Sequence, residues 1–313
     1  MTVQRIVTAL AVGAALTGAA TAAEPEQCQK VTISDVGWTD ITATTALAST
    51  VLQALGYETE TKVLSLPVTF TALSTDDLDI FLGNWMPTME ADIGPYTEAG
   101  TIDTVRVNLT GAKYTLATNK AGADLGIADF ADIAKHADAL SSTIYGIEPG
   151  NDGNRLLLEM VADNKFDLGT FEILESSEQG MLAQVSRADN SGQPVVFLGW
   201  EPHPMNTQFE LTYLTGGDDV FGPDFGGAEV RTNTRAGYVE ECPNVGKFLQ
   251  NLEFTLPMES EVMGIILNDG ADPMAAAKEW LEANPDAVTP WIDGVTTADG
   301  GDAQAAISEA LGG

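Results

Sequence analysis

The sequence predicts an α/β fold with two lobes, and two observations support this. Apolar runs typical of strands alternate with helix-like runs within residues 31–86, and the same rhythm returns within residues 127–202. Such alternation is typical of a parallel sheet covered by helices. In addition, three apolar runs are each followed by a glycine and, within two residues, by a tryptophan: Trp38, Trp85 and Trp200. We therefore expect tryptophans at strand ends, where ligands bind in open α/β sheets.

The first 23 residues have the features of a signal peptide. A single positive charge within residues 1–5 precedes an apolar run at 6–16, and small residues follow at 19–23. This order predicts cleavage near Ala22–Ala23 and export to the periplasm or an equivalent space. No later apolar run approaches the eighteen or so residues that a membrane-spanning helix needs.

The first lobe begins with a strand at residues 31–36, after which Asp40 is expected to cap a helix. That helix has Leu47, Val51 and Leu55 on one face. A proline starts the next helix, as is common at a first helical turn. The other elements expected here are a strand at 62–66, a helix at 67–74 and a strand at 78–82, which places Trp85 just past a strand end.

The chain then crosses to a second lobe through two strand-like runs, 105–109 and 114–118, separated by Gly111. Residues 209–214 are expected to carry it back, and strand 230–234 with the helices beyond residue 242 completes the first lobe. Two crossings make a hinge, and the cleft between lobes is the expected ligand site. The predicted limits are 24–110 and 215–313 for lobe 1 and 111–214 for lobe 2. In lobe 2 we expect helices at 127–135, 155–163 and 181–187 and strands at 143–147, 171–175 and 195–198.

Composition excludes several partners. The formal net charge of −32 makes nucleic acid and anionic membranes poor partners. We interpret this charge first as a solvated acidic surface that keeps an exported protein soluble, and weak attraction of cations is the other interpretation. The two cysteines, Cys28 and Cys242, are expected to form a disulfide in an oxidising compartment. With two histidines in the chain they cannot form a zinc site, and we expect neither a metal nor a cofactor.

Converging tryptophans would suit one kind of ligand. Indole faces attract cations, most effectively cations that bury methyl groups and have no N–H donors to satisfy, which describes a quaternary ammonium. The alternative is that the tryptophans pack in the core. That interpretation is preferred for Trp280, in an Ala-rich helix expected at 274–283, and for Trp291, and neither is assigned to the site.

Several separated motifs agree in order with one known family. They are Gly37-Trp38-Thr39-Asp40, Gly83-Asn84-Trp85-Met86-Pro87, Lys113-Tyr114, Pro149-Gly150-Asn151-Asp152 and Gly199-Trp200-Glu201-Pro202-His203-Pro204. Over nearly the whole chain beyond the leader, the sequence resembles the glycine betaine/choline substrate-binding family, and within it the periplasmic choline-binding proteins of bacterial ABC importers.

The resemblance implies a two-lobed type II periplasmic-binding-protein fold and a disulfide between Cys28 and Cys242. It implies a choline receptor, expected to be a monomer, that delivers its ligand to a membrane permease and an ATPase. Asp40 would neutralise the cation and Asn151 would hydrogen-bond the choline hydroxyl. The implied aromatic box consists of Trp38, Trp85, Tyr114 and Trp200.

Other interpretations stay open from the residues alone. Asp40 suits a helix cap, Asn151 suits a turn, and Tyr114 suits ordinary packing; His203 is best interpreted as a structural loop residue. A receptor for glycine betaine or a related betaine or carnitine is the alternative function, with Lys113 and Arg155 as partners for a ligand carboxylate. An exported hydrolase is disfavoured, since Gly-x-Ser-x-Gly and His-Glu-x-x-His motifs are absent. We therefore do not expect an enzyme.

Overall fold

The computed structural model describes residues 23–312, so the predicted leader up to Ala22 lies outside the described residues. The strands are β1 (Lys30–Asp35), β2 (Glu58–Val63), β3 (Ile80–Met86), β4 (Ile102–Asn119), β5 (Thr143–Tyr145), β6 (Glu172–Leu174), β7 (Val196–Glu201), β8 (Leu211–Tyr213) and β9 (Gly227–Arg235). Within the described part they join into one nine-stranded sheet. Its order is β2-β1-β3-β9-β4-β7-β5-β6, and β8 pairs with β4.

Strand directions differ between the centre and the ends of this sheet. β1 runs parallel to β2 and β3, and β5 runs parallel to β6 and β7. The central pairs β3–β9, β9–β4 and β4–β7 are antiparallel. The expected parallel arrangement is therefore right at both ends and wrong in the middle, where β4 and β9 traverse the molecule in opposite directions.

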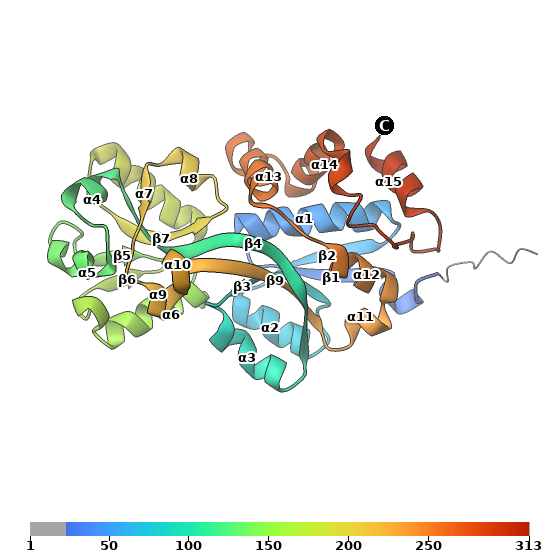
Figure 1. Cartoon of the computed structure of the whole chain (residues 1–313), viewed down its shortest axis with the longest axis horizontal. Coiled ribbons are helices and arrows are strands. Elements are labelled where there is room, and N and C mark those ends of the chain that lie inside the picture. The colour runs from blue at the N-terminus through green and yellow to red at the C-terminus, as the bar shows by residue number, and fades with distance from the viewer. Residues whose placement is uncertain (1–22, 313) are drawn as a thin grey trace, which may run out of the picture.

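Helices cover both faces of the sheet, as the alternating pattern predicted. α1, α13, α14 and α15 lie on one side of β1–β3, and α2 and α3 lie on the other (Figure 1). The longer helices are α1 (Thr39–Ala54), α2 (Leu66–Ser74), α3 (Glu90–Glu98), α6 (Asp152–Ala162), α7 (Glu178–Ser191), α12 (Pro243–Asn251), α13 (Leu256–Asp269), α14 (Pro273–Ala283) and α15 (Ala303–Leu311). The shorter ones are α4 (Lys120–Leu125), α5 (Phe130–Ile133), α8 (Met205–Gln208), α9 (Asp218–Phe221), α10 (Pro223–Gly226) and α11 (Tyr238–Glu241).

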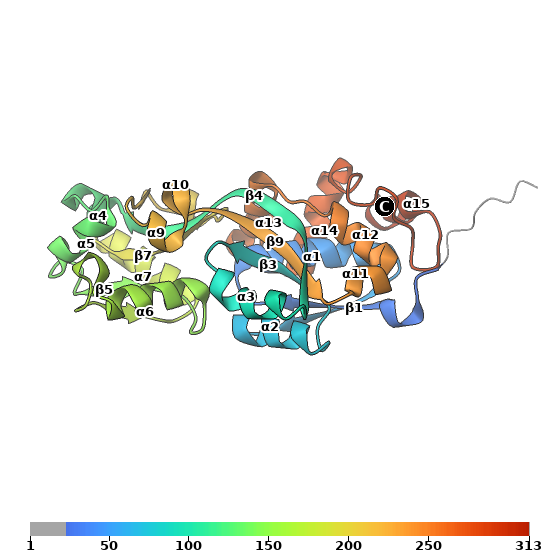
Figure 2. The same ribbon diagram turned by 60° about the horizontal axis from the view of Figure 1, so that its bottom comes forward.

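Two long strands connect the lobes. Figures 1 and 2 show β4 and β9 running side by side between the group containing β1–β3 and the group containing β5–β7. The predicted break at Gly111 is wrong, because β4 continues through it. Gly111 has a φ of +76°, and the β4–β9 register shifts between Leu109 and Ala112. The glycine thus accommodates an irregularity within one strand rather than ending it.

The return crossing lies later than residues 209–214. These residues include β8, whose residues pair with Ala117, Thr118 and Asn119 at the far end of β4. The chain returns along β9. The domain limits drawn at residues 110 and 215 stay a prediction, because one continuous sheet contains both crossings.

Helix starts differ from expectation by a few residues: α6 and α7 begin three residues earlier than predicted, and two other differences have a clear cause. α1 begins at Thr39 with Trp38 in the N-cap position, so Asp40 lies in the first turn and is not a cap. The helix expected at 127–135 begins later, at Phe130, because Asp129 caps α5 through a capping box with Asp132.

Trp85 and Trp200 lie inside strands rather than just past them, in the last residues of β3 and β7. The preceding glycines leave space for a neighbour instead of ending the strand. A Cβ on Gly199 would lie 2.9 Å from Cβ of Ala117, and one on Gly83 would lie 2.7 Å from the Ile41 side chain. Gly37, at φ +84°, does follow the end of its strand.

The two ends of the described chain pack into the first lobe. The disulfide joins Cys28 to Cys242, the pairing that the resemblance implied. Trp280 and Trp291 are buried, as expected for core residues. Among the described residues, the helices are too short or too polar to cross a membrane.

Candidate functional site

One cavity brings together all six residues that were predicted to bind a ligand, and Ile147 and Asp152 complete its lining. Both lobes contribute to it. Its walls come from the start of α1 (Trp38, Asp40), from β3 (Trp85), β4 (Tyr114) and β7 (Trp200), and from the start of α6 and the loop before it (Ile147, Asn151, Asp152).

The aromatic walls meet edge to face around Tyr114. Its ring centroid lies 6.0 Å from that of Trp85 and 6.3 Å from that of Trp200, with interplanar angles of 63° and 87°. Phe221 packs on Tyr114 at 5.8 Å. Each of the four aromatic residues of the predicted box is at most 5% exposed. The rings therefore form a shielded site held by aromatic contacts of favourable geometry.

Asp40 is a buried carboxylate with one oxygen left over. The Trp85 indole Nε1–H donates to its Oδ2 at 3.0 Å, while Oδ1 is buried and has no hydrogen-bond partner in the described part of the chain. Burial, followed by the nearby Glu178 carboxylate, raises the pKa of Asp40 to about 8. A positive charge in the cavity would reverse this effect by stabilising the ionised form.

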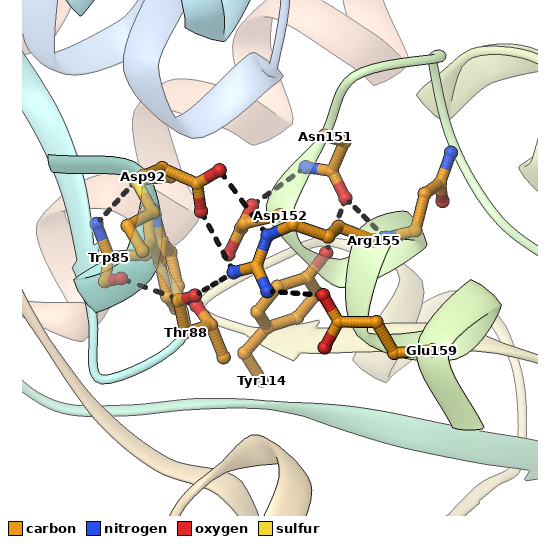
Figure 3. A network of polar contacts seen from close by, with 10 residues as sticks. Trp85, Thr88, Asp92, Tyr114, Asn151, Asp152, Arg155 and Glu159 are labelled. Atoms are coloured by element: carbon orange, nitrogen blue, oxygen red, sulfur yellow. Dashed lines mark hydrogen bonds and ion pairs between the residues drawn. The ribbon is translucent and has the colours of Figure 1, made fainter. Parts of the chain in front are cut away.

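Asn151 is both a helix cap and part of a network inside the cavity (Figure 3). Its Oδ1 accepts hydrogen bonds from the Tyr114 hydroxyl and from the Asn154 amide, both at 3.0 Å. Its Nδ2 donates to Oδ1 of Asp152 at 3.0 Å. The amide oxygen is thus fully engaged, whereas the amide nitrogen has a second N–H to offer.

Two acidic residues of lobe 2 hold the start of α1 in lobe 1. The Trp38 indole Nε1–H donates to Glu148 Oε1 at 2.7 Å. The Thr39 backbone N–H donates to Glu178 Oε2 at 2.9 Å, and the Thr39 hydroxyl donates to the other oxygen of the same carboxylate. These contacts fix the residues on either side of Thr39, both of which line the cavity.

A third contact between the lobes involves Arg155. Its guanidinium donates to both Asp92 oxygens, at 2.9 and 3.3 Å, and to the Thr88 carbonyl oxygen at 2.9 Å (Figure 3). Lys113 lies 4.9 Å from the centroid of the Tyr213 ring. Neither cation lines the cavity, so the two side chains considered as partners for a ligand carboxylate lie elsewhere.

His203 supports the site from behind. Its Nδ1 accepts a hydrogen bond from the Met205 amide at 3.0 Å, which leaves the proton on Nε2 to face Glu178 Oε1 at 3.2 Å. Its ring also packs edge to face on Trp200, with centroids 5.0 Å apart. These contacts fit the predicted structural role of His203. The histidine also positions Glu178, a residue that the sequence analysis did not select.

Carboxylates in the cavity and around it dominate its electrostatics. Burial raises the pKa of Glu148 to about 7 and that of Asp152 to about 6, and it raises the pKa of Glu259, close to Asp40, well above its usual value. The residues that line the cavity include no lysine, arginine or histidine. The arrangement is that of a small cation site with aromatic walls.

Comparison with known proteins places the chain in a family. Residues 29–283 match the substrate-binding domain of ABC-type glycine betaine transport systems. The chain belongs to this family. Its members are substrate-binding receptors of ABC transporters, and the predicted type II periplasmic-binding-protein fold is confirmed by solved relatives.

Two solved structures are similar over nearly their full length. An ABC-transporter choline-binding protein in complex with choline is 67% identical, with a TM-score of 0.91, over 92% of this chain and 100% of that one. For an unliganded, semi-closed structure of such a protein, the identity and coverage are the same and the TM-score is 0.85. The fold described here is thus more similar to the choline complex.

A more distant member of the family has a different named ligand. The glycine betaine/carnitine transport binding protein GbuC of Listeria monocytogenes is 33% identical over 186 residues. The alignment covers 59% of this chain and 57% of that protein. The named ligands therefore differ among these relatives, and the ligand of this chain has to be inferred from the residues of its cavity.

Proposed function

We propose that this chain is a periplasmic solute receptor that binds choline in an aromatic box by cation–π interactions and delivers it to an ABC importer. One observation carries the proposal. A cavity with aromatic walls contains two aspartates and no cationic side chain, in a chain 67% identical to a choline-binding receptor.

The chemistry of the cavity matches a quaternary ammonium. The quaternary –N(CH3)3+ group of choline has no N–H donors, so it requires aromatic faces and a nearby negative charge rather than hydrogen-bond acceptors. In this proposal the aromatic box supplies the faces and Asp40 supplies the charge. Asn151 bonds the hydroxyl oxygen of choline through its free N–H.

A receptor for glycine betaine or carnitine is the alternative, and the Listeria relative supports it. A ligand carboxylate needs donors such as Arg or Lys. Here Arg155 donates to Asp92 and Thr88, and Lys113 lies over Tyr213. The carboxylate would instead meet Asp40 and Asp152, which favours choline.

The remaining parts of the proposal concern context. We infer that residues 1–23 direct export and are removed near Ala22–Ala23, and that the receptor acts as a monomer. Its partners are a membrane permease and an ATPase. We propose a binding role and no catalysis, because the cavity contains no nucleophile beside a base: its polar side chains are two carboxylates, one amide, one phenol and three indoles.

A titration of the mature protein against several ligands tests the proposed function. We expect choline to bind and to raise the melting temperature, because a ligand that binds only the folded state stabilises it. Choline should bind at least tenfold more tightly than glycine betaine, a difference of about 1.4 kcal/mol. The measurement is calorimetry with choline, acetylcholine, glycine betaine and carnitine. Absence of binding by every quaternary ammonium would remove the proposal, and a preference for betaine would establish the alternative.

Gly153→Ala is expected to weaken choline binding at least tenfold without changing any charge. A Cβ at Gly153 would lie 2.0 Å from the Tyr114 hydroxyl oxygen and 3.1 Å from Asn151 Oδ1, so the tyrosine must leave its place in the box. Calorimetric titration measures the loss.

Gly122→Ala is the matched control. Its Cβ would lie 1.9 Å from the Thr118 hydroxyl oxygen, a clash of the same kind, but Thr118 does not line the cavity. This variant should lose stability and keep its affinity. Equal affinities for the two variants would contradict the role of Tyr114.

A further inference from the structure

Asp152 is a cavity residue for which the sequence predicted no role. It is the first residue of α6, directly after the capping Asn151, and its side chain is inaccessible to solvent. Its Oδ1 accepts the hydrogen bond from Asn151 Nδ2, while Oδ2 is buried and has no hydrogen-bond partner within bonding distance among the described residues (Figure 3). The Thr88 side chain lies near enough to lower the pKa of this carboxyl, but its hydroxyl donates to the Trp85 carbonyl oxygen. A buried carboxylate oxygen without a donor is costly, so this atom has an interaction to gain from a bound molecule.

Arg155 does not donate a hydrogen bond to Asp152 Oδ2. All hydrogen bonds of the Arg155 guanidinium go to Asp92, Glu159 and the Thr88 carbonyl oxygen. The amino terminus of α6 favours a negative charge at this position, which helps to keep Asp152 ionised. Although burial raises its pKa to about 6, the carboxyl is still mostly ionised at pH 7.5.

Asp40 and Asp152 are two buried carboxylates that line the cavity from different lobes. Asp40 comes from α1 in lobe 1 and Asp152 from α6 in lobe 2. Within residues 23–312, each has one buried oxygen without a hydrogen-bond partner. Closing an empty cavity brings both carboxylates out of water; Arg155 compensates the charge of Asp152 only in part, and the lining of the cavity includes no cationic side chain. A ligand with a net positive charge offsets both, whereas a zwitterion with its own carboxylate offsets neither fully.

We propose that Asp152 is a second carboxylate of the ligand site. It accepts a hydrogen bond from the hydroxyl group of the ligand and selects cationic over zwitterionic quaternary ammonium compounds. This rests on the proposed function. A hydroxyl group is both a donor and an acceptor. The free N–H of Asn151 donates to its oxygen, and Asp152 Oδ2 accepts from it. A ligand carboxylate in the same position would face Asp152 with no proton to share.

Asp152→Asn tests this inference, because asparagine keeps the size and removes the charge. The probes are choline, tetramethylammonium, which lacks the hydroxyl, and glycine betaine, which has a carboxylate in its place. We expect choline to lose at least tenfold in affinity and tetramethylammonium to lose less. Glycine betaine should bind as tightly as before or more tightly, so the ratio of choline to betaine affinity should fall at least tenfold.

Equal losses for all three ligands would show that Asp152 only starts the helix, and an unchanged affinity ratio would also overturn the inference. Asp163→Asn is the matched control: it removes an exposed carboxylate at the other end of α6 and should change none of the affinities. If the Asn variant does not fold, Asp152→Ser provides the same comparison of affinity ratios. Failure of the wild-type protein to bind choline would remove the proposed function itself, which is a separate result.

Discussion

Replacing Trp200 or Trp85 by alanine is expected to weaken choline binding at least tenfold while the protein stays folded. Each substitution removes one aromatic face from a cavity whose aromatic walls are buried, a loss of about 1–2 kcal/mol, and it makes room for water as well. A factor of ten corresponds to about 1.4 kcal/mol. Trp85 should cost more than Trp200, because its indole Nε1–H is also the hydrogen-bond donor to Asp40. Calorimetric titration gives the affinities, and circular dichroism gives the melting temperatures.

Two further variants separate the contributions. Trp85→Phe keeps an aromatic face but removes the indole N–H, so its affinity should lie between those of the wild type and Trp85→Ala. Trp280→Ala is the control, since Trp280 is a buried tryptophan of α14 outside the cavity. It should lower the melting temperature and leave the affinity unchanged. If Trp85→Ala and Trp200→Ala behave like Trp280→Ala, the tryptophans of the cavity are core residues and the box is not a binding site.

The sequence was sufficient to group three tryptophans because of their common placement after glycine. The structure assigns a different cause to two of those glycines. Gly83 and Gly199 lie within strands, where neighbouring side chains leave no space for a Cβ. Close approach and chain termination both favour glycine, so a pattern of residues cannot distinguish them. The tryptophans were therefore placed near the right edge of the sheet but one or two residues too far along.

The acidic residues that join the lobes could not be found in the same way. Glu178 and Glu148 bind Thr39 and Trp38, which are 139 and 110 residues away in the chain. Glu178 directly follows the cap of α7, where an acidic residue is ordinary, and the chain has 46 acidic residues in all. Their role depends on the juxtaposition of two lobes, which no local pattern records.

Asp40, in contrast to Glu178 and Glu148, was selected from the sequence, but with two competing interpretations. Its position at a helix start suggested a cap, and the resemblance suggested a partner for a cation. The structure removes the first interpretation, because the cap position belongs to Trp38. What remains is a first-turn carboxylate that, among the described residues, receives a hydrogen bond from one other side chain, the Trp85 indole. Burial without compensation is difficult to explain by packing, and it is readily explained by a ligand charge.

Choline affinity is expected to rise with pH between about 6 and 8. In the ligand-free protein, burial and the Glu178 carboxylate raise the pKa of Asp40 to about 8. Because this pKa lies above the unfolded value, Asp40 favours the folded state at low pH, and that contribution is lost as pH rises through 8. A bound cation favours the ionised carboxylate and lowers the pKa. Binding below pH 8 therefore releases a proton, and affinity gains up to about tenfold per pH unit for each proton released.

Titrations at pH 6, 7 and 8, in buffers of different ionisation enthalpy, measure both the affinity and the protons released. Asp40→Asn should weaken choline most at pH 8 and reduce the slope of affinity against pH. Some slope should remain, because the pKa values of Glu148, about 7, and Asp152, about 6, lie in the same range. Asp163→Asn should keep the wild-type slope, since that carboxylate is exposed. A wild-type affinity that does not change between pH 6 and 8, with no proton release, would mean that Asp40 does not respond to the charge of the ligand.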